Sequence, residues 1–275
     1  MFPMLALYPK RLRQFILLSV ALTVLIIAIL LFNRSANPGV WIVLGVIGIA
    51  GLLVSCSGSA MKEHQAETAR LYDGLDAEGF IRDYSVHLGQ KMPSQDTALM
   101  VRMHLSNAYA SLGRFDEAER VLLEMPRKEK KKEESNLFTS FAITSNLCYC
   151  AEQKGDTEKA QKYLDELLSL RKRLEELQLS KPQSKRLTFN TELNEQCMRY
   201  LKEGKADSEA LKELVKGSRQ QLPKITTSLW LARAYLADGN REEAEKLLRR
   251  IVELAPALYP GKTAAKLLGE LDAKQ

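Results

Sequence analysis

An apolar stripe with helical spacing on both sides of a glycine is the feature that most constrains this chain. In residues 228–256, apolar side chains recur every three or four residues, the period that places them on one face of an α-helix. The stripe is interrupted at Gly239-Asn240 and ends at Pro256, and its members are Leu231, Ala234, Tyr235, Leu236, Ala244, Leu247, Leu248 and Ile251. The pattern predicts a helix, a tight turn and a second helix. One hairpin of this size cannot bury both stripes, so it needs neighbours of its own kind.

Two further copies of the pattern surround Gly113 and Gly155. The first carries Leu105, Ala108, Tyr109, Ala118, Leu122 and Pro126, and the second carries Leu147, Ala151, Ala160, Leu164 and Leu167. Gly204 follows Tyr200 at the expected distance, but Ala210 comes one residue late, so we interpret this unit as a degenerate copy. The pattern resembles the tetratricopeptide repeat. The resemblance implies an all-α fold in which helical hairpins stack into a solenoid, with residues 258–274 as a polar-faced capping helix.

Two long apolar runs, residues 14–32 and 39–56, lie near the N-terminus. Every residue between Gln14 and Cys56 is uncharged except Arg34. A helix of about 19 residues spans roughly 28 Å, close to the hydrocarbon thickness of a bilayer. We therefore expect an N-terminal two-helix transmembrane hairpin over residues 1–56, with the lipid bilayer as one partner of the chain.

Basic residues predict the orientation of this hairpin. They lie on the outer side of both runs, at Lys10, Arg11, Arg13, Lys62 and Arg70, whereas Arg34 stands alone between the runs. Because basic residues are retained on the cytoplasmic side, both termini are expected in the cytoplasm. The expected location is the bacterial cytoplasmic membrane, as a two-span protein with cytosolic repeats.

Two processing events are alternatives to this topology. Leu53-Val54-Ser55-Cys56 resembles a lipobox, whose cysteine is lipidated after cleavage, and that event would reverse the topology. A signal peptide cleaved near Ala36 is the other alternative, although its apolar run is long for a signal peptide and Arg34 is a poor neighbour for a cleavage site.

Small residues mark one side of the second run, at Gly45, Gly48, Gly51 and Ser55. Such a surface lets another helix approach closely. The first interpretation is packing within the hairpin against Ser19 and Thr23, and the second is association with a helix of another chain. Neither run contains an ionisable side chain, which transport generally requires, so the pattern favours an anchor over a transporter.

The rest of the chain divides into two predicted parts. Residues 57–95 form a juxtamembrane helical segment that begins with a flexible joint, Ser57-Gly58-Ser59, and can also be interpreted as a degenerate first repeat. Residues 96–275 form the tetratricopeptide-like solenoid, whose first helix starts near a cap at Pro93-Ser94-Gln95-Asp96. Two polar stretches, residues 127–134 and 180–185, are expected to be loops.

The resemblance implies a groove made by the first helix of each pair, where the family commonly binds peptides or protein termini. It assigns eight candidate partner-binding residues: Met103, Asn107, Tyr149, Glu152, Asn194, Met198, Leu229 and Arg233. Asn107 matches the asparagine with which some members hold a carboxylate, but Met103 stands where those members have lysine, so that clamp is incomplete. Arg233 is a candidate for an anion contact or for a structural ion pair.

No pattern of catalytic or ligand-binding residues stands out. The motifs of nucleophilic, metal-dependent and phosphate-binding enzymes are missing from the sequence, so no catalytic, cofactor or metal site is expected. Cys148 and Cys150 point to different faces of a predicted helix, which favours a structural role. After Ser57 the chain carries 40 − 4 = 36 basic residues against 34 acidic ones, which argues against a nucleic-acid surface.

These observations lead to one functional hypothesis and one alternative. The hypothesis is a membrane-anchored scaffold, not an enzyme, whose cytosolic groove binds peptide or protein partners. The alternative is a non-catalytic regulatory subunit of a membrane enzyme or protein-export complex, docked through the glycine face at Gly45, Gly48 and Gly51.

Overall fold

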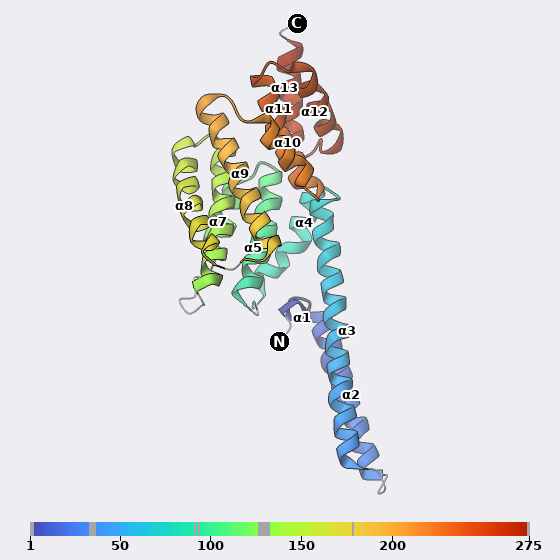
Figure 1. The fold of residues 1–275 in the computed structure, drawn as a ribbon. Helices are drawn as coiled ribbons and strands as arrows, with labels where there is room; N and C mark the ends of the chain where they lie inside the picture. The colour runs from blue at the N-terminus through green and yellow to red at the C-terminus, as the bar shows by residue number, and fades with distance from the viewer. Residues whose placement is uncertain are drawn as a thin grey trace. The chain divides into compact units, whose positions relative to one another are not determined.

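The computed structural model describes residues 3–32, 37–90, 92, 94–125, 133–177 and 179–273. Within these ranges all regular structure is helical, which confirms the predicted all-α fold (Figure 1). The chain divides into two compact units. The N-terminal unit comprises Met1–Thr68 with Gly89–Ala98, and the repeat unit comprises Ala69–Leu88 with Leu99–Gln275.

The N-terminal unit is built around two long antiparallel helices. A short helix α1 (Pro3–Leu7) leads into α2 (Pro9–Phe32), and α3 (Pro38–Tyr72) returns beside it (Figure 1). Both α2 and α3 are long and apolar enough to cross a membrane, and none of the apolar window of α2 is buried inside the protein. The predicted hairpin of two candidate spans is therefore present, with residues 14–32 and 39–56 inside these helices.

The prediction of a flexible joint at Ser57-Gly58-Ser59 was wrong, because α3 runs through these residues without a break. One glycine in a helix interior costs only about 1 kcal/mol relative to alanine. Cys56 and Ala60, which flank the three residues, are buried, and this packing offsets that cost. Side chains also join the helices beyond the apolar runs: the Tyr8 hydroxyl donates to Glu67 at 2.6 Å, and Arg11 Nε donates to Glu63 at 2.8 Å.

Small residues bring α2 and α3 together, and the side chains nearest to the glycines are Ile26 and Leu22. A Cβ atom on Gly45 would lie 2.6 Å from Ile26 Cδ1, and one on Gly48 would lie 2.7 Å from Leu22 Cδ2. The Thr23 hydroxyl donates to the Ser19 carbonyl oxygen within α2, and packing of α3 against Ser19 and Thr23 stays a prediction. Packing within the hairpin therefore uses Gly45 and Gly48, whereas Gly51 faces open space.

The repeat unit is a succession of helical hairpins. After the end of α3 and α4 (Ala77–Tyr84), a 3-10 turn η1 (Ser85–Gly89) precedes the hairpins. These are α5 (Gln95–Ser111) with α6 (Phe115–Leu123), α7 (Glu133–Lys154) with α8 (Thr157–Glu175), α9 (Lys181–Glu203) with α10 (Ser208–Gly217), and α11 (Gln221–Ala237) with α12 (Arg241–Leu254), followed by α13 (Tyr259–Asp272). Each helix packs on the next along the chain from α6 to α13, apart from the weaker pair α9 and α10, and α7 also packs on α9.

The predicted turn glycines all have left-handed backbone conformations. Gly113, Gly155, Gly204 and Gly239 have φ between 68° and 80°, a region that glycine enters without steric cost. Asp156 and Asn240 follow two of them as N-caps, and their side chains accept from backbone N–H groups of α8 and α12. In the turn between α3 and α4, Leu75 (φ 57°) has the left-handed conformation that glycine has in the other turns. It lies directly before the N-cap Asp76. The turn between α3 and α4 thus has the same left-handed backbone as the four that glycine marks, and the interpretation of residues 57–95 as a degenerate repeat stays a prediction.

The two predicted loops have different outcomes. Residues 180–185 are not a loop, because α9 begins at Lys181 and the Gln183 side chain accepts from the Ser180 backbone N–H at 3.0 Å. This capping box, with proline in the first turn, starts a helix where the composition indicated a connector. Of residues 127–134, all but the first two residues of α7 lie outside the described residues. The predicted cap of α5 is present, since the Thr97 N–H donates to Ser94 Oγ.

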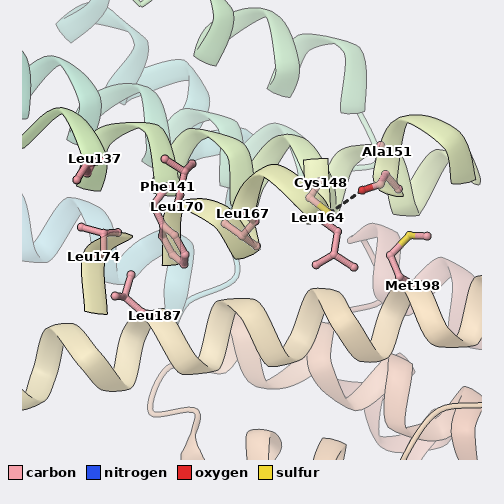
Figure 2. Close-up of a cluster of buried hydrophobic side chains, with 11 residues drawn as sticks. Leu137, Phe141, Cys148, Ala151, Leu164, Leu167, Leu170, Leu174, Leu187 and Met198 are labelled. Atoms are coloured by element: carbon pink, nitrogen blue, oxygen red, sulfur yellow. Dashed lines mark hydrogen bonds between the residues drawn. The ribbon is translucent and has the colours of Figure 1, made fainter. Parts of the chain in front are cut away.

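One hydrophobic cluster of the repeat unit joins α7, α8 and α9 (Figure 2). Leucines from α8 point between α7 and α9, and they include Leu164, Leu167, Leu170 and Leu174. Phe141 and Cys148 come from α7, and Leu187 and Met198 come from α9. A second cluster around Trp230 joins α9, α10 and α11. Neighbouring hairpins therefore bury the stripes that one hairpin cannot cover alone.

Candidate protein-binding face

The eight predicted groove residues lie on α5, α7, α9 and α11, the first helices of the four hairpins. The chain itself buries five of them: Met103, Glu152, Asn194, Met198 and Leu229. The other three, Asn107, Tyr149 and Arg233, are half-buried. Only these three remain candidates for direct contact in the described conformation, and partner binding by any of the eight stays a prediction.

Asn107 already has an intramolecular partner. Its side-chain amide donates to the Tyr72 hydroxyl at 2.8 Å, and the same hydroxyl lies 2.8 Å from His104 Nδ1. Burial raises the pKa of Tyr72 to about 12, so the phenol keeps its proton at neutral pH. This network joins the end of α3 to α5 and already uses one N–H of the Asn107 amide.

Glu152 is a carboxyl group in the interior of the repeat unit. Its side chain is 2% exposed, Cys148 Sγ donates to Oε1 at 3.3 Å, and Oε2 has no hydrogen-bond partner among the described residues. Burial raises the pKa of Glu152 to about 8, while hydrogen bonds from Cys148 and Cys197 act in the opposite direction. The group is therefore mostly protonated at pH 7, because ionisation in this interior is costly.

The cysteines near Glu152 are buried free thiols. Cys148 packs in the cluster of α7, α8 and α9, Cys150 packs beside Phe115, and Cys197 packs near Trp230. Burial raises the pKa of Cys150 to about 12 and also raises the pKa values of Cys148 and Cys197. Thiols in this state are poor nucleophiles and poor metal ligands. In the ranges that the structure describes, no group of three or more His, Cys, Asp or Glu residues could hold a metal ion.

Arg233 stacks on an aromatic ring. Its guanidinium carbon lies 4.4 Å from the centre of the Trp230 ring, which in turn meets Tyr200 edge-on at 5.8 Å. Within the described part of the chain Arg233 forms no ion pair, so the structural ion pair considered from the sequence is replaced by a cation–π contact. The buried indole N–H of Trp230 has no hydrogen-bond partner there either.

An ion-pair network that sequence reasoning missed joins the first two glycine-marked hairpins. Glu119 on α6 is 7% exposed and lies 3.0 Å from both Lys154 of α7 and Lys159 of α8. Asp116 adds a contact with Lys154 at 3.1 Å. The sequence shows only charges on predicted helices, and no local spacing pairs residues from three different helices.

The last helix also contacts the first of these hairpins, which the sequence did not predict. The Tyr259 ring meets the Phe115 ring edge-on at 5.0 Å, and a Cβ atom on Gly113 would lie 2.9 Å from Tyr259 Cδ2. Ala110, Ala118 and Cys150 belong to the same cluster, with Tyr109 and Tyr149 packed against it. In addition, the Gln221 backbone N–H at the start of α11 donates to Asp73 Oδ1 at 3.4 Å. Packing between neighbouring helices covers the buried groove residues: Met198 lies in the cluster of α7, α8 and α9, Met103 packs against Leu122 and Leu147, and the Asn194 amide donates to Ser145 Oγ at 3.3 Å.

Comparison with known proteins places repeats on the same hairpins. Residues 146–173 and 226–250 match models of the tetratricopeptide repeat, and residues 104–129 match the PPR repeat model. The matched segments cover most of α7–α8, α11–α12 and α5–α6. They support a tetratricopeptide-like family of helical repeats. Neither the curated proteins nor the solved structures gave a match.

Proposed function

We propose that this chain is a membrane-anchored scaffold whose repeat unit binds peptide or protein partners on the cytosolic side of a membrane. The observation that carries the proposal is the combination of repeat matches on three hairpins with two long apolar helices in one chain. Repeats of this kind generally serve in protein interaction, and nothing in the described residues points to catalysis.

The anchor part of the proposal is supported by the surface of α2 and α3. Large apolar side chains cover the outside of both helices, including Leu17, Leu31 and Phe32 on α2 and Ile42, Val46 and Ile47 on α3. An apolar surface of this extent is unstable in water and needs lipid or protein to cover it. Fusion of a reporter that fluoresces only in the cytosol to the C-terminus tests the orientation. The proposal requires fluorescence, whereas a dark reporter with full-length protein in the membrane contradicts a cytosolic repeat unit.

The binding part is tested by photo-crosslinking from the half-buried residues of the predicted groove. A photo-reactive amino acid replaces Asn107, Tyr149 or Arg233 in the full chain in intact cells, and Lys266, exposed on α13, serves as the control position. We expect one polypeptide to be captured from at least two of the three groove positions and not from Lys266. Equal capture from all four positions, or none, contradicts a binding face on these helices.

Gly51 favours the second candidate function, a regulatory subunit that docks on a membrane protein through α3. A side chain at this position would meet no atom within 4 Å, so the surface is open to a helix of another protein. Gly51→Leu should then dissolve the complex in detergent, and Gly58→Leu, which also meets open space but lies after the apolar run, should leave it intact. A scaffold that binds only through its repeats keeps its partners in both variants.

A further inference from the structure

Three exposed basic side chains of the N-terminal unit lie at one level of the α2–α3 helix pair. They are Lys10 and Arg13 on α2 and Lys62 on α3, and together they are called the basic collar. A hydrogen bond of 2.8 Å from Arg11 Nε to Glu63 Oε1 shows which parts of the two antiparallel helices lie side by side. Because each helical residue rises about 1.5 Å, the three backbone positions lie within about 5 Å of one another along the helix axis.

The apolar surface of both helices ends at the basic collar. On α2, Arg13 is followed directly by Gln14, which begins an uncharged run that continues to the end of the helix. On α3, Lys62 directly follows Met61, the last large apolar side chain that the helix exposes. The change from apolar to basic therefore falls at the same level on both helices. In a bilayer this is the level at which hydrocarbon gives way to headgroups.

The basic collar has no acidic partner of its own. In the part of the chain that the structure describes, none of its three side chains forms an ion pair or a side-chain hydrogen bond. The two acidic side chains near this level already have partners: Glu63 pairs with Arg11, and Glu67 accepts from the Tyr8 hydroxyl at 2.6 Å. The unit therefore presents uncompensated positive charge next to its apolar surface, which attracts anions at that depth.

We propose that the basic collar binds the headgroups of anionic phospholipids in the leaflet that surrounds it. Lys and Arg hold phosphate oxygens through charge-assisted hydrogen bonds, and a zwitterionic headgroup attracts them less because it also carries a cation. The occupant is a lipid rather than a free anion, since exposed apolar side chains such as Ile16 and Met61 adjoin the collar and contact the acyl chains. The inference rests on the anchor part of the proposed function, and it holds for either orientation of the helix pair.

The test is electron paramagnetic resonance of spin-labelled lipids around the full chain in phosphatidylcholine vesicles. One sample contains a trace of spin-labelled phosphatidylglycerol, which is anionic, and the other contains spin-labelled phosphatidylcholine. Lipids in contact with the helices give a motionally restricted signal, and its relative size in the two samples gives the preference for the anionic lipid. We expect a preference of about threefold in the wild type, which weakens as salt is added.

Two sets of substitutions in the basic collar separate its charge from its side-chain shape. Lys10→Gln, Arg13→Gln and Lys62→Gln in one chain should lower the preference to about one, because the attraction to the headgroups is lost. Lys10→Arg, Arg13→Lys and Lys62→Arg in one chain keep the charge and should keep the preference. All three positions are exposed, so neither set of changes disturbs the packing of α2 on α3.

A matched control removes the same charge from the repeat unit. Lys162→Gln, Lys246→Gln and Lys262→Gln in one chain change exposed positions of α8, α12 and α13 and should leave the preference at the wild-type level. Equal restriction of both lipids by the wild type overturns the proposal. So does a preference that survives the three glutamines in the collar, or one that falls as far in the control. A missing restricted signal with both lipids contradicts the anchor itself, so failure of the lipid preference and failure of the proposed function are distinguishable.

Discussion

The two units differ in which side chains lie between their helices and which lie on their outer surfaces. In the N-terminal unit the small residues Gly45 and Gly48 lie between α2 and α3, and large apolar side chains face outward. In the repeat unit leucines such as Leu167 lie inside, and charged side chains cover the outer surface. Helix pairs can therefore be stabilised by either arrangement, and the surrounding solvent decides which one is stable. The apolar outer surface of the N-terminal unit is compatible with lipid, and the charged outer surface of the repeat unit is compatible with water.

The largest expected effect comes from removing a leucine inside the repeat unit. Leu167 is fully buried between α7 and α9, so Leu167→Ala should lower the free energy of unfolding by about 2–5 kcal/mol. Its neighbour Leu168 is 37% exposed, and Leu168→Ala should cost less than about 1 kcal/mol. Urea titration of the full chain in nanodiscs, followed by circular dichroism, measures both. Equal losses would show that the hairpins do not stack as described.

Removal of one charge from the interface of the first two glycine-marked hairpins should have an intermediate effect. Glu119→Gln leaves Lys154 and Lys159 without their shared buried partner and should cost about 1–3 kcal/mol. Glu124→Gln is the control, since Glu124 is 59% exposed and 3.8 Å from Arg102, and it should cost less than about 0.5 kcal/mol. A loss in Glu119→Gln no larger than in the control would contradict a structural role for this network.

Stability of the repeat unit should fall as pH rises, because of Glu152. Its pKa rises from 4.5 to about 8 on folding, so its contribution is fully present below pH 4.5 and is lost between pH 4.5 and 8. One proton contributes at most about 1.4 kcal/mol per pH unit. Chemical unfolding at a series of pH values should show this slope in the wild type and a flatter profile in Glu152→Gln. Identical profiles would show that Glu152 is already ionised in the folded unit.

The smallest expected effect is a gain at the α3–α4 turn. Leu75 has a left-handed backbone that is unfavourable for leucine, so Leu75→Gly should raise the free energy of unfolding by up to about 1 kcal/mol. Leu112 is also half-buried in a hairpin turn but lacks a positive φ, and Leu112→Gly should lower stability. Thermal melting of both variants measures the two changes in stability. A loss in both would mean that the side chain of Leu75 contributes more than its backbone costs.

Sequence periodicity predicted the elements because helices obey local rules. The stripe around Gly239 and the apolar runs needed only spacing, length and turn chemistry, and the structure has helices in those places. Packing outweighed local propensity at Gly58 inside α3. At Ser180 the composition indicated a loop, but a local signal, the capping box with Gln183, starts a helix. The contact of Tyr259 with Gly113 joins residues far apart in sequence. The spacing of residues within one hairpin cannot predict a contact between distant segments of the chain.

Tryptophan quenching by lipid tests most directly whether the two units belong in different solvents. The chain has two tryptophans, half-exposed Trp41 on α3 and buried Trp230 on α11, so Trp230→Phe and Trp41→Phe each leave one reporter. In vesicles of brominated phosphatidylcholine, the account predicts strong quenching of the Trp41 fluorescence and emission from Trp230 at the level of unbrominated vesicles. Fluorescence from Trp41 that brominated lipid leaves unchanged, or quenching of both tryptophans alike, would contradict an anchor in lipid and a repeat unit in water.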